Sequence, residues 1–203
     1  MRLPDHEAAI VLGGGGARAA YQVGALRAIV RILGRQGRLP FPVVCGTSAG
    51  AINAVALAVH ADDFRRGVAR LVRWWRRIAV GDVYRTDFAA LSRHSAQFLA
   101  SVLTGTRPPS GVASLLDNAP LAALLGREFD FARIAAHVAR GDLHALSINA
   151  TSYTTGEAVT FFEGVPTLPG WQRMRRRGER TRLALEHLLV TTAIPFMFPA
   201  GRI

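Results

Sequence analysis

The sequence predicts a single α/β domain in which helices flank a mostly parallel central sheet. Two observations lead to this prediction. Residues 8–59 alternate short apolar runs with helical patterns in a β-α-β-α order. Half of the 203 residues are hydrophobic and only 19% are charged, which is enough apolar material for a sizeable core. No internal repeat or linker is present, so residues 1–203 are expected to form one domain.

The first quarter of the chain predicts two strands, each followed by a helix. Residues 8–12 are an apolar run typical of a buried strand, and 13–16 are a glycine loop. Apolar residues recur at helical spacing over 17–33, which predicts a helix. A second buried strand is expected at 41–45, before a helix over 49–59 that is apolar almost all round. Strands joined by a helix pair in parallel, which gives the sheet its direction.

The rest of the chain predicts helices first and strands afterwards. Residues 62–140 have a helical pattern, with breaks expected near Gly81, at 104–111 and at Pro120. The later elements expected are a strand at 143–150, a turn at 155–156, a strand at 158–162, an exposed loop at 164–178, a helix at 183–190 and a proline-punctuated apolar end at 194–199.

The charge of the chain is strongly positive. The formal net charge is +11, and all 25 basic residues are arginine. This indicates either a compositional bias or attraction to an anionic partner. Zinc-ligand spacing, an RNP aromatic stripe and heptads after a basic region are all missing from the sequence, so a membrane surface ranks above nucleic acid as the partner.

The cysteine content and the N-terminus bear on compartment and cofactor. Cys45 is the only cysteine, so an internal disulfide is excluded, and we expect neither a metal nor a cofactor. The N-terminus lacks the order of a secretory signal, so a cytoplasmic protein is expected, with peripheral membrane contact as a further option. Residues 39–61 carry no Asp, Glu, Lys or Arg, but their prolines and glycines argue against a membrane-spanning helix.

The first motif that carries chemistry is G-T-S-A-G at 46–50. An apolar strand precedes it and an apolar helix follows, which is the strand–turn–helix context of a nucleophile elbow. Ser48 would project beside the helix N-terminus, where the helix dipole favours developing negative charge. The alternative is a glycine-rich helix cap with no catalytic role.

The second motif, the glycine loop, has two interpretations. Gly14, Gly16 and Ala19 satisfy the dinucleotide fingerprint, but no acidic residue lies between Glu7 and Asp62, where that fingerprint needs one. As an oxyanion hole, the same glycines would offer backbone N–H groups to an attacked carbonyl. The elbow favours the second interpretation.

Together these segments resemble the patatin-like phospholipase family. The glycine block at 12–26 and the elbow at 46–50 occur in the family's order, and the blocks at 117–121, 149–156 and 192–199 also resemble family segments. The resemblance implies a patatin-like fold and a serine acyl hydrolase acting on phospholipids or other lipid esters, without a cofactor or metal.

The resemblance also implies roles for individual residues. Ser48 would be the nucleophile, and Gly14, Gly15 and Gly16 would form the oxyanion hole. Arg18 occupies the family's basic position and would contact substrate phosphate or support the loop, unless it is an ordinary exposed arginine. Ala19 departs from the glycine usual there.

The base that would activate Ser48 is not evident in the sequence. His60 lies 12 residues along the elbow helix, about 18 Å away. The family uses an aspartate in an Asp-Gly-Gly or Asp-Gly-Ala turn, and none of the eight aspartates here precedes glycine. We therefore expect a domain incomplete at its C-terminus, with the aspartate beyond Ile203 and the 203-residue form inactive. The alternatives are a catalytically inactive lipid-binding module and, third, a Rossmann-type nucleotide-binding protein.

A basic amphipathic stretch at 64–78 has two interpretations of its own. Val68, Leu71 and Trp75 share one helical stripe, while arginines occupy the other side. The segment is either a core-packing helix with a solvated arginine face or an interfacial helix with Trp74 and Trp75 at headgroup depth.

Overall fold

The computed structural model describes residues 8–34, 37–84, 100, 103–104, 116–194, 198–201 and 203. The chain divides into two compact units, which are described separately. Unit 1 comprises Met1–Arg77 and Phe129–Thr192, and unit 2 comprises Ile78–Glu128 and Ala193–Ile203.

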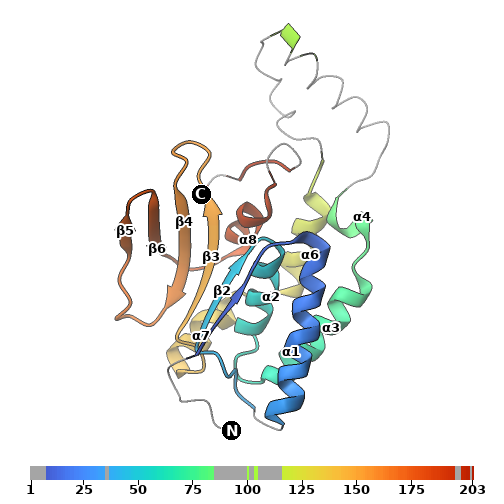
Figure 1. Ribbon diagram of the computed structural model, residues 1–203, viewed down its shortest axis with the longest axis vertical. Helices are drawn as coiled ribbons and strands as arrows, with labels where there is room; N and C mark the ends of the chain where they lie inside the picture. Colours follow the sequence, from blue (N-terminus) through green and yellow to red (C-terminus); the bar gives the residue numbers. More distant parts are fainter. Residues whose placement is uncertain are drawn as a thin grey trace. The chain divides into compact units, whose positions relative to one another are not determined.

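Unit 1 is built on one sheet of mixed direction, with strand order β1-β2-β3-β4-β6-β5 (Figure 1). The pairs β1/β2, β2/β3 and β4/β6 are parallel, whereas β3/β4 and β5/β6 are antiparallel. The predicted α/β fold with a mostly parallel sheet is confirmed. The strands are β1 Ala9–Leu12, β2 Val43–Thr47, β3 Ala145–Thr151, β4 Ala158–Gly164, β5 Trp171–Arg173 and β6 Arg176–Arg180.

The core of unit 1 centres on helix α2, Ala49–Ala58, all ten residues of which are buried. Because its sequence AGAINAVALA carries no charge, the helix can be covered on every side by β2, β3, α3 and α8. The helices of this unit are η1 Gly16–Ala19, α1 Ala20–Leu33, α2, α3 Phe64–Arg77, α7 Ala132–Arg140 and α8 Leu185–Thr192.

The prediction of an exposed loop at 164–178 is right about exposure for most of these residues but wrong about the loop from Trp171 onward. Strands β5 and β6 form a hairpin there, and β6 joins the sheet beside β4. The ladder to β4 stabilises a strand whose arginine-rich sequence shows no apolar alternation. Trp171 lies across Gly178, where a Cβ would overlap its indole ring, so the aromatic side chain covers a glycine that has no side chain to pack.

The predicted breaks near Gly81 and Pro120 each lie a few residues earlier than expected, at residues 78–79 and just before Ala119. Helix α3 ends at Arg77, and Gly81 lies inside the short helix α4, Val80–Val83. Pro120 lies in the first turn of α6, Ala119–Glu128, where its missing N–H breaks no helical hydrogen bond. Of the expected break at 104–111, all but residue 104 lies outside the described residues.

Unit 2, as far as it is described, contains α4 and α6, which contact each other. The ring of Tyr84 lies 6.1 Å from that of Phe198, between centroids. The helices in the described part of the chain are all too short or too polar to cross a bilayer.

Candidate active site

Ser48 occupies a strained turn between β2 and α2. Its backbone has φ 53° and ψ −129°, in the left-handed half of conformational space that residues with a side chain rarely adopt. Its carbonyl oxygen accepts from Ala51 N at 2.8 Å, which starts the helix immediately after the turn. A strained serine directly after a strand and before a helix is the geometry expected of a nucleophile elbow.

The two glycines of the motif are required by close backbone approach. A Cβ on Gly46 would lie 2.8 Å from the Cβ of Ala54, one turn into α2. A Cβ on Gly50 would overlap the carbonyl oxygens of Leu12 and Gly13 at the end of β1. Neither position can hold a side chain unless the backbone moves, so these glycines let strand, turn and helix meet.

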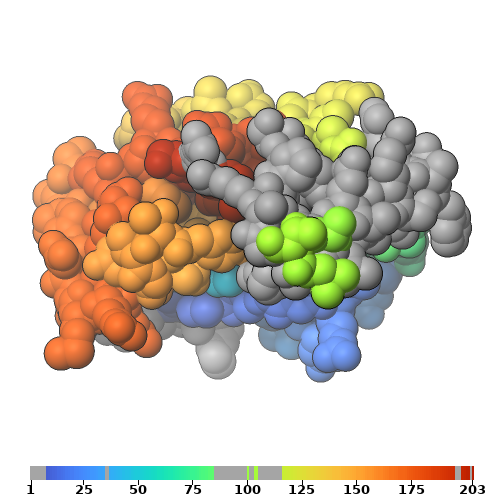
Figure 2. Space-filling model, turned by 90° about the horizontal axis from the view of Figure 1, so that it is seen from above, coloured from blue at the N-terminus to red at the C-terminus, as the bar shows by residue number. Residues whose placement is uncertain are grey.

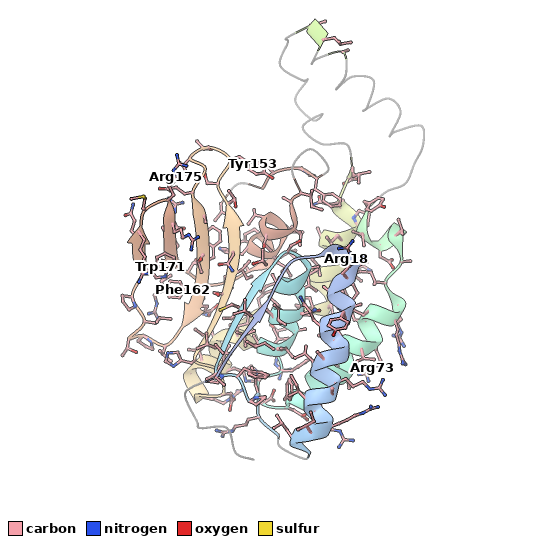
Figure 3. The ribbon with its side chains drawn as sticks, in the orientation of Figure 1. Arg18, Arg73, Tyr153, Phe162, Trp171 and Arg175 are labelled. Atoms are coloured by element: carbon pink, nitrogen blue, oxygen red, sulfur yellow. The ribbon has the colours of Figure 1, made fainter. Side chains whose placement is uncertain are left out.

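The glycine loop lies beside the serine. A Cβ on Gly14 would be 3.2 Å from the Ser48 Cβ and 3.9 Å from its Oγ. A Cβ on Gly15 or Gly16 would have no atom of Ser48 within 4 Å, and Gly16 has φ +55°. The Arg18 side chain is exposed, while its backbone N–H donates to Gly15 O at 3.1 Å (Figure 3). The structure therefore brings Gly14 to the serine and leaves the Arg18 side chain on the surface of the same loop.

A network of hydrogen bonds around the buried Asn53, not predicted from the sequence, holds this loop. Gln22 on α1 donates to Gly13 O at 2.8 Å. Asn53 on α2, fully buried, donates to Ala19 O at 3.1 Å and to Gln22 Oε1 at 2.9 Å. Trp75 on α3 donates from its indole nitrogen to Asn53 Oδ1 at 2.7 Å. Side chains from α1, α2 and α3 thus hold the glycine loop in place.

The orientation of each amide in the network follows from the indole. Because an indole N–H can only donate, the Asn53 oxygen must face Trp75. The Asn53 NH₂ group then faces Gln22 Oε1, which leaves the Gln22 NH₂ group for Gly13 O. The signal in the sequence was Asn53 itself, the one polar side chain in an otherwise apolar helix.

We predict that, in a product that carries the aspartate expected beyond Ile203, Trp75→Phe lowers the turnover number for an ester while leaving KM nearly unchanged, because the loop loses the donor that orders its anchoring amides. It should also destabilise the fold by about 1–3 kcal/mol, since Asn53 Oδ1 is left without its donor. Trp74→Phe is the matched control, because the buried Trp74 Nε1 has no hydrogen-bond partner within the described residues. Urea unfolding and ester kinetics on both variants measure the difference; equal effects would show that Trp75 acts only through its bulk.

The other side of the elbow is held by hydroxyl groups. Ser48 N donates to Thr191 Oγ1 at 2.8 Å, and that hydroxyl donates to Asn149 O at 2.5 Å. The Asn149 side chain donates to Thr47 Oγ1 at 3.2 Å and accepts from Thr160 at 2.7 Å. Helix α8 and strands β3 and β4 therefore fix the turn that carries the serine.

Asp142 is not placed to act on Ser48. Its Oδ2 accepts from Arg140 Nε at 3.0 Å and is paired with His137 Nδ1 at 3.1 Å. Although burial opposes the shift, these hydrogen bonds hold the pKa of Asp142 below its ordinary value. Asp142 precedes β3, whereas Ser48 follows β2; because the strands are parallel, the two residues lie at opposite edges of the sheet.

The His187 side chain is held by contacts other than Ser48. Its Nδ1 accepts from Ala184 N at 3.1 Å, and its ring packs on Phe161 with centroids 5.0 Å apart. Burial lowers its pKa, so the imidazole is held neutral. It lies one helical turn before Thr191, and no hydrogen bond joins it to Ser48 among the described contacts.

The other side chains of unit 1 considered as a base for Ser48 are either hydrogen-bonded elsewhere or far from the serine. His60, Asp62 and Asp63 lie at the far end of α2 from Ser48. Asp130 accepts the backbone N–H of Ala132, at the start of α7. Within the described part of unit 1, no carboxylate or imidazole contacts the serine hydroxyl.

Helix α3 is a core-packing helix. Phe64, Val68, Leu71 and Trp74 are buried, and Trp74 is only 7% exposed. The Trp75 indole is engaged with Asn53. The hypothesis that places both tryptophans at headgroup depth is therefore wrong, because the helix uses them to close the protein interior.

This arrangement defines an α/β protein with a strained serine elbow beside a glycine loop. A sequence model described as patatin-like phospholipase matches residues 10–203, which include both motifs and the whole sheet from Ile10 onward. The chain belongs to the patatin-like phospholipase family, whose members are typically hydrolases acting on lipid esters. No curated protein and no solved structure matches the chain.

Proposed function

We propose that this protein hydrolyses acyl esters of lipids, of the phospholipase A or esterase type, through an acyl intermediate on Ser48. The observation that carries the proposal is the position of Ser48: its backbone is strained, it directly follows β2, and Gly14 lies so close that a Cβ there would be 3.2 Å from the Ser48 Cβ. Gln22 holds the glycine loop through Gly13 O, and Asn53 holds Gln22 in turn. This supports the same function, because an oxyanion hole must be preorganised.

The proposed reaction has two balanced steps. Ser48 Oγ attacks the ester carbonyl carbon while a base takes its proton, and the backbone N–H groups of Gly14, Gly15 and Gly16 stabilise the oxyanion. Collapse of that intermediate releases the alcohol, which receives the proton, and leaves the acyl group on Ser48. Water then attacks the acyl-enzyme with the same base, releasing the fatty acid and regenerating the serine. Each lost oxyanion donor typically costs about 10²–10³ in rate.

We further propose that the base is the aspartate of the Asp-Gly turn that family resemblance implies, outside the residues described here. The described side chains of unit 1 support this, because Asp142 and His187 are both held by other partners. Arg18, exposed on the glycine loop, would contact the substrate phosphate. The same lack of a neighbouring base also favours a second candidate function, a lipid-binding module without catalysis.

The two candidate functions are separated by comparing two lengths of the protein. A product extended through an Asp-Gly-Gly or Asp-Gly-Ala turn should hydrolyse a p-nitrophenyl acyl ester, and the 203-residue chain should be slower by about 10³-fold or more. Equal rates would place the base within this chain. No hydrolysis by either product would favour the lipid-binding module.

A further inference from the structure

The hairpin that the sequence did not predict lies at the same edge of the sheet as Ser48. Strands β2 and β3 end at this edge, and β4, antiparallel to β3, begins there. Since β6 is parallel to β4, the connection between β5 and β6, Met174 and Arg175, also lies at this edge. Figure 2 looks down on it and shows the β3–β4 turn, in light orange, beside the deeper orange hairpin.

The strand register gives the scale of this arrangement. It aligns four residues across the sheet, namely Thr47, Asn149, Thr160 and Gly178. Three interstrand steps of about 4.8 Å place the hairpin about 14 Å to the side of the elbow. Its tip extends about 7 Å beyond the level of Ser48, at about 3.3 Å per residue. A flat surface touching the tip would therefore face the serine.

The tip combines an apolar side chain with unpaired positive charge. Met174 is 93% exposed, and Tyr153 on the neighbouring β3–β4 turn is 57% exposed (Figure 3). The arginines beside Met174 are exposed, and none of them has a carboxylate partner among the described contacts; they are Arg173, Arg175 and Arg176. The nearby carboxylates of Glu157 and Glu179 both pair with Arg177, at 3.7 and 2.9 Å.

The backbone of the tip is held in a defined conformation. Arg175 has φ 54°, and its carbonyl accepts from Ala158 N at 3.0 Å, which ties the tip to β4. At the base of the hairpin, Arg180 donates to the carbonyl oxygens of the four residues Gly164, Val165, Pro166 and Leu168. Arg180 is thus a structural arginine, in contrast to those at the tip.

We propose that the β5–β6 tip docks the protein on an anionic lipid surface, with Met174 entering the interface and Arg173, Arg175 and Arg176 meeting lipid phosphates. Guanidinium groups suit phosphate oxygens, and an exposed apolar side chain between them suits the boundary between headgroups and acyl chains. The proposal rests on the proposed function for its purpose, because a lipid hydrolase meets its substrate at such a surface.

Vesicle co-sedimentation of the Ser48→Ala chain tests docking without hydrolysis. The protein should bind vesicles of phosphatidylcholine and phosphatidylglycerol in equal amounts far better than phosphatidylcholine alone. The Arg173→Gln/Arg175→Asn/Arg176→Gln triple variant should bind roughly a hundredfold more weakly, at about fivefold per arginine. Asparagine is used at 175 because it tolerates positive φ.

Two further variants make the test specific to the hairpin. Arg65→Gln/Arg73→Gln/Arg76→Gln removes the same charge from the exposed face of α3 and should lower binding by no more than about threefold, the share expected of screened, distant charges. Met174→Ala keeps the charge and should weaken binding by about tenfold, including at high salt.

Several outcomes would overturn the proposal. If both triple variants lost vesicle binding equally, binding would depend only on net charge. If the α3 variant lost more, the lipid-binding surface would lie on α3. Absence of vesicle binding, together with arginine-dependent binding of single-stranded DNA, would assign the hairpin to nucleic acid. These results do not depend on Ser48, so failure of docking and failure of the proposed hydrolysis remain distinguishable.

Discussion

The Ser48→Ala variant of the protein that carries its aspartate is expected to lose ester hydrolysis by about 10⁴-fold or more. The reason is that the attacking atom is removed while the oxyanion loop stays in place, so only residual acceleration by the loop and by binding remains. The fold should survive, since alanine removes one oxygen and the backbone bond from Ser48 N to Thr191 persists.

A matched control shows whether the lost activity is specific to Ser48 or follows from removing any serine hydroxyl of the sheet. Ser147→Ala makes the same chemical change on β3, two residues before Asn149, and should retain hydrolysis. Progress curves on a p-nitrophenyl ester and thermal melts of both variants measure the two effects. Unchanged turnover in Ser48→Ala would remove the serine from the mechanism.

Gly50→Ala is expected to destabilise the fold by about 3 kcal/mol or more, the upper range of overpacking effects. The added methyl group would overlap the carbonyl oxygens of Leu12 and Gly13, which are backbone atoms that cannot rotate away. This overlap could be relieved only if α2 moved away from the end of β1. The glycine loop would then shift with respect to Ser48, so hydrolysis should fall as well.

The control for this substitution is another helical glycine. A Cβ on Gly24, on α1, meets nothing within 4 Å. Gly24→Ala should therefore stabilise the protein by about 0.5–1 kcal/mol through helix propensity. Urea unfolding should show that the free energy of unfolding falls in Gly50→Ala and rises in Gly24→Ala. A Gly50→Ala protein as stable as the parent would mean that the approach of β1 to α2 is looser than the structure shows.

Much of the elbow could be predicted from the sequence because its signals are local. The strand, the glycines, the serine and the helix occupy consecutive residues at 43–58. Both glycines of the motif lie where a Cβ would clash, Gly46 against α2 and Gly50 against the end of β1. The strands β1 and β2 followed from apolar runs joined by one helix, so their parallel pairing needed no long-range information.

The features that escaped prediction depend on residues far apart in the chain. Asn53 lies 31 residues from Gln22 and 22 from Trp75, and no spacing rule links an amide on one helix to an indole on another. The hairpin was missed because its arginines and Gly178 show no alternation; its stability comes from pairing with β4 and from Trp171 lying over the glycine. For α3, the amphipathic pattern was equally compatible with a membrane and with the core, and only the neighbouring helices decide.

Locating a covalent adduct tests directly whether Ser48 is the nucleophile. The extended protein is treated with a fluorophosphonate, digested with trypsin and analysed by mass spectrometry. Cleavage after Arg38 and Arg65 yields the peptide 39–65, in which Ser48 is the only serine. We predict one phosphonyl group, on Ser48, and none after Ser48→Ala. An adduct on another residue, or hydrolysis of esters without any adduct on this peptide, would contradict the assignment of Ser48 as the nucleophile.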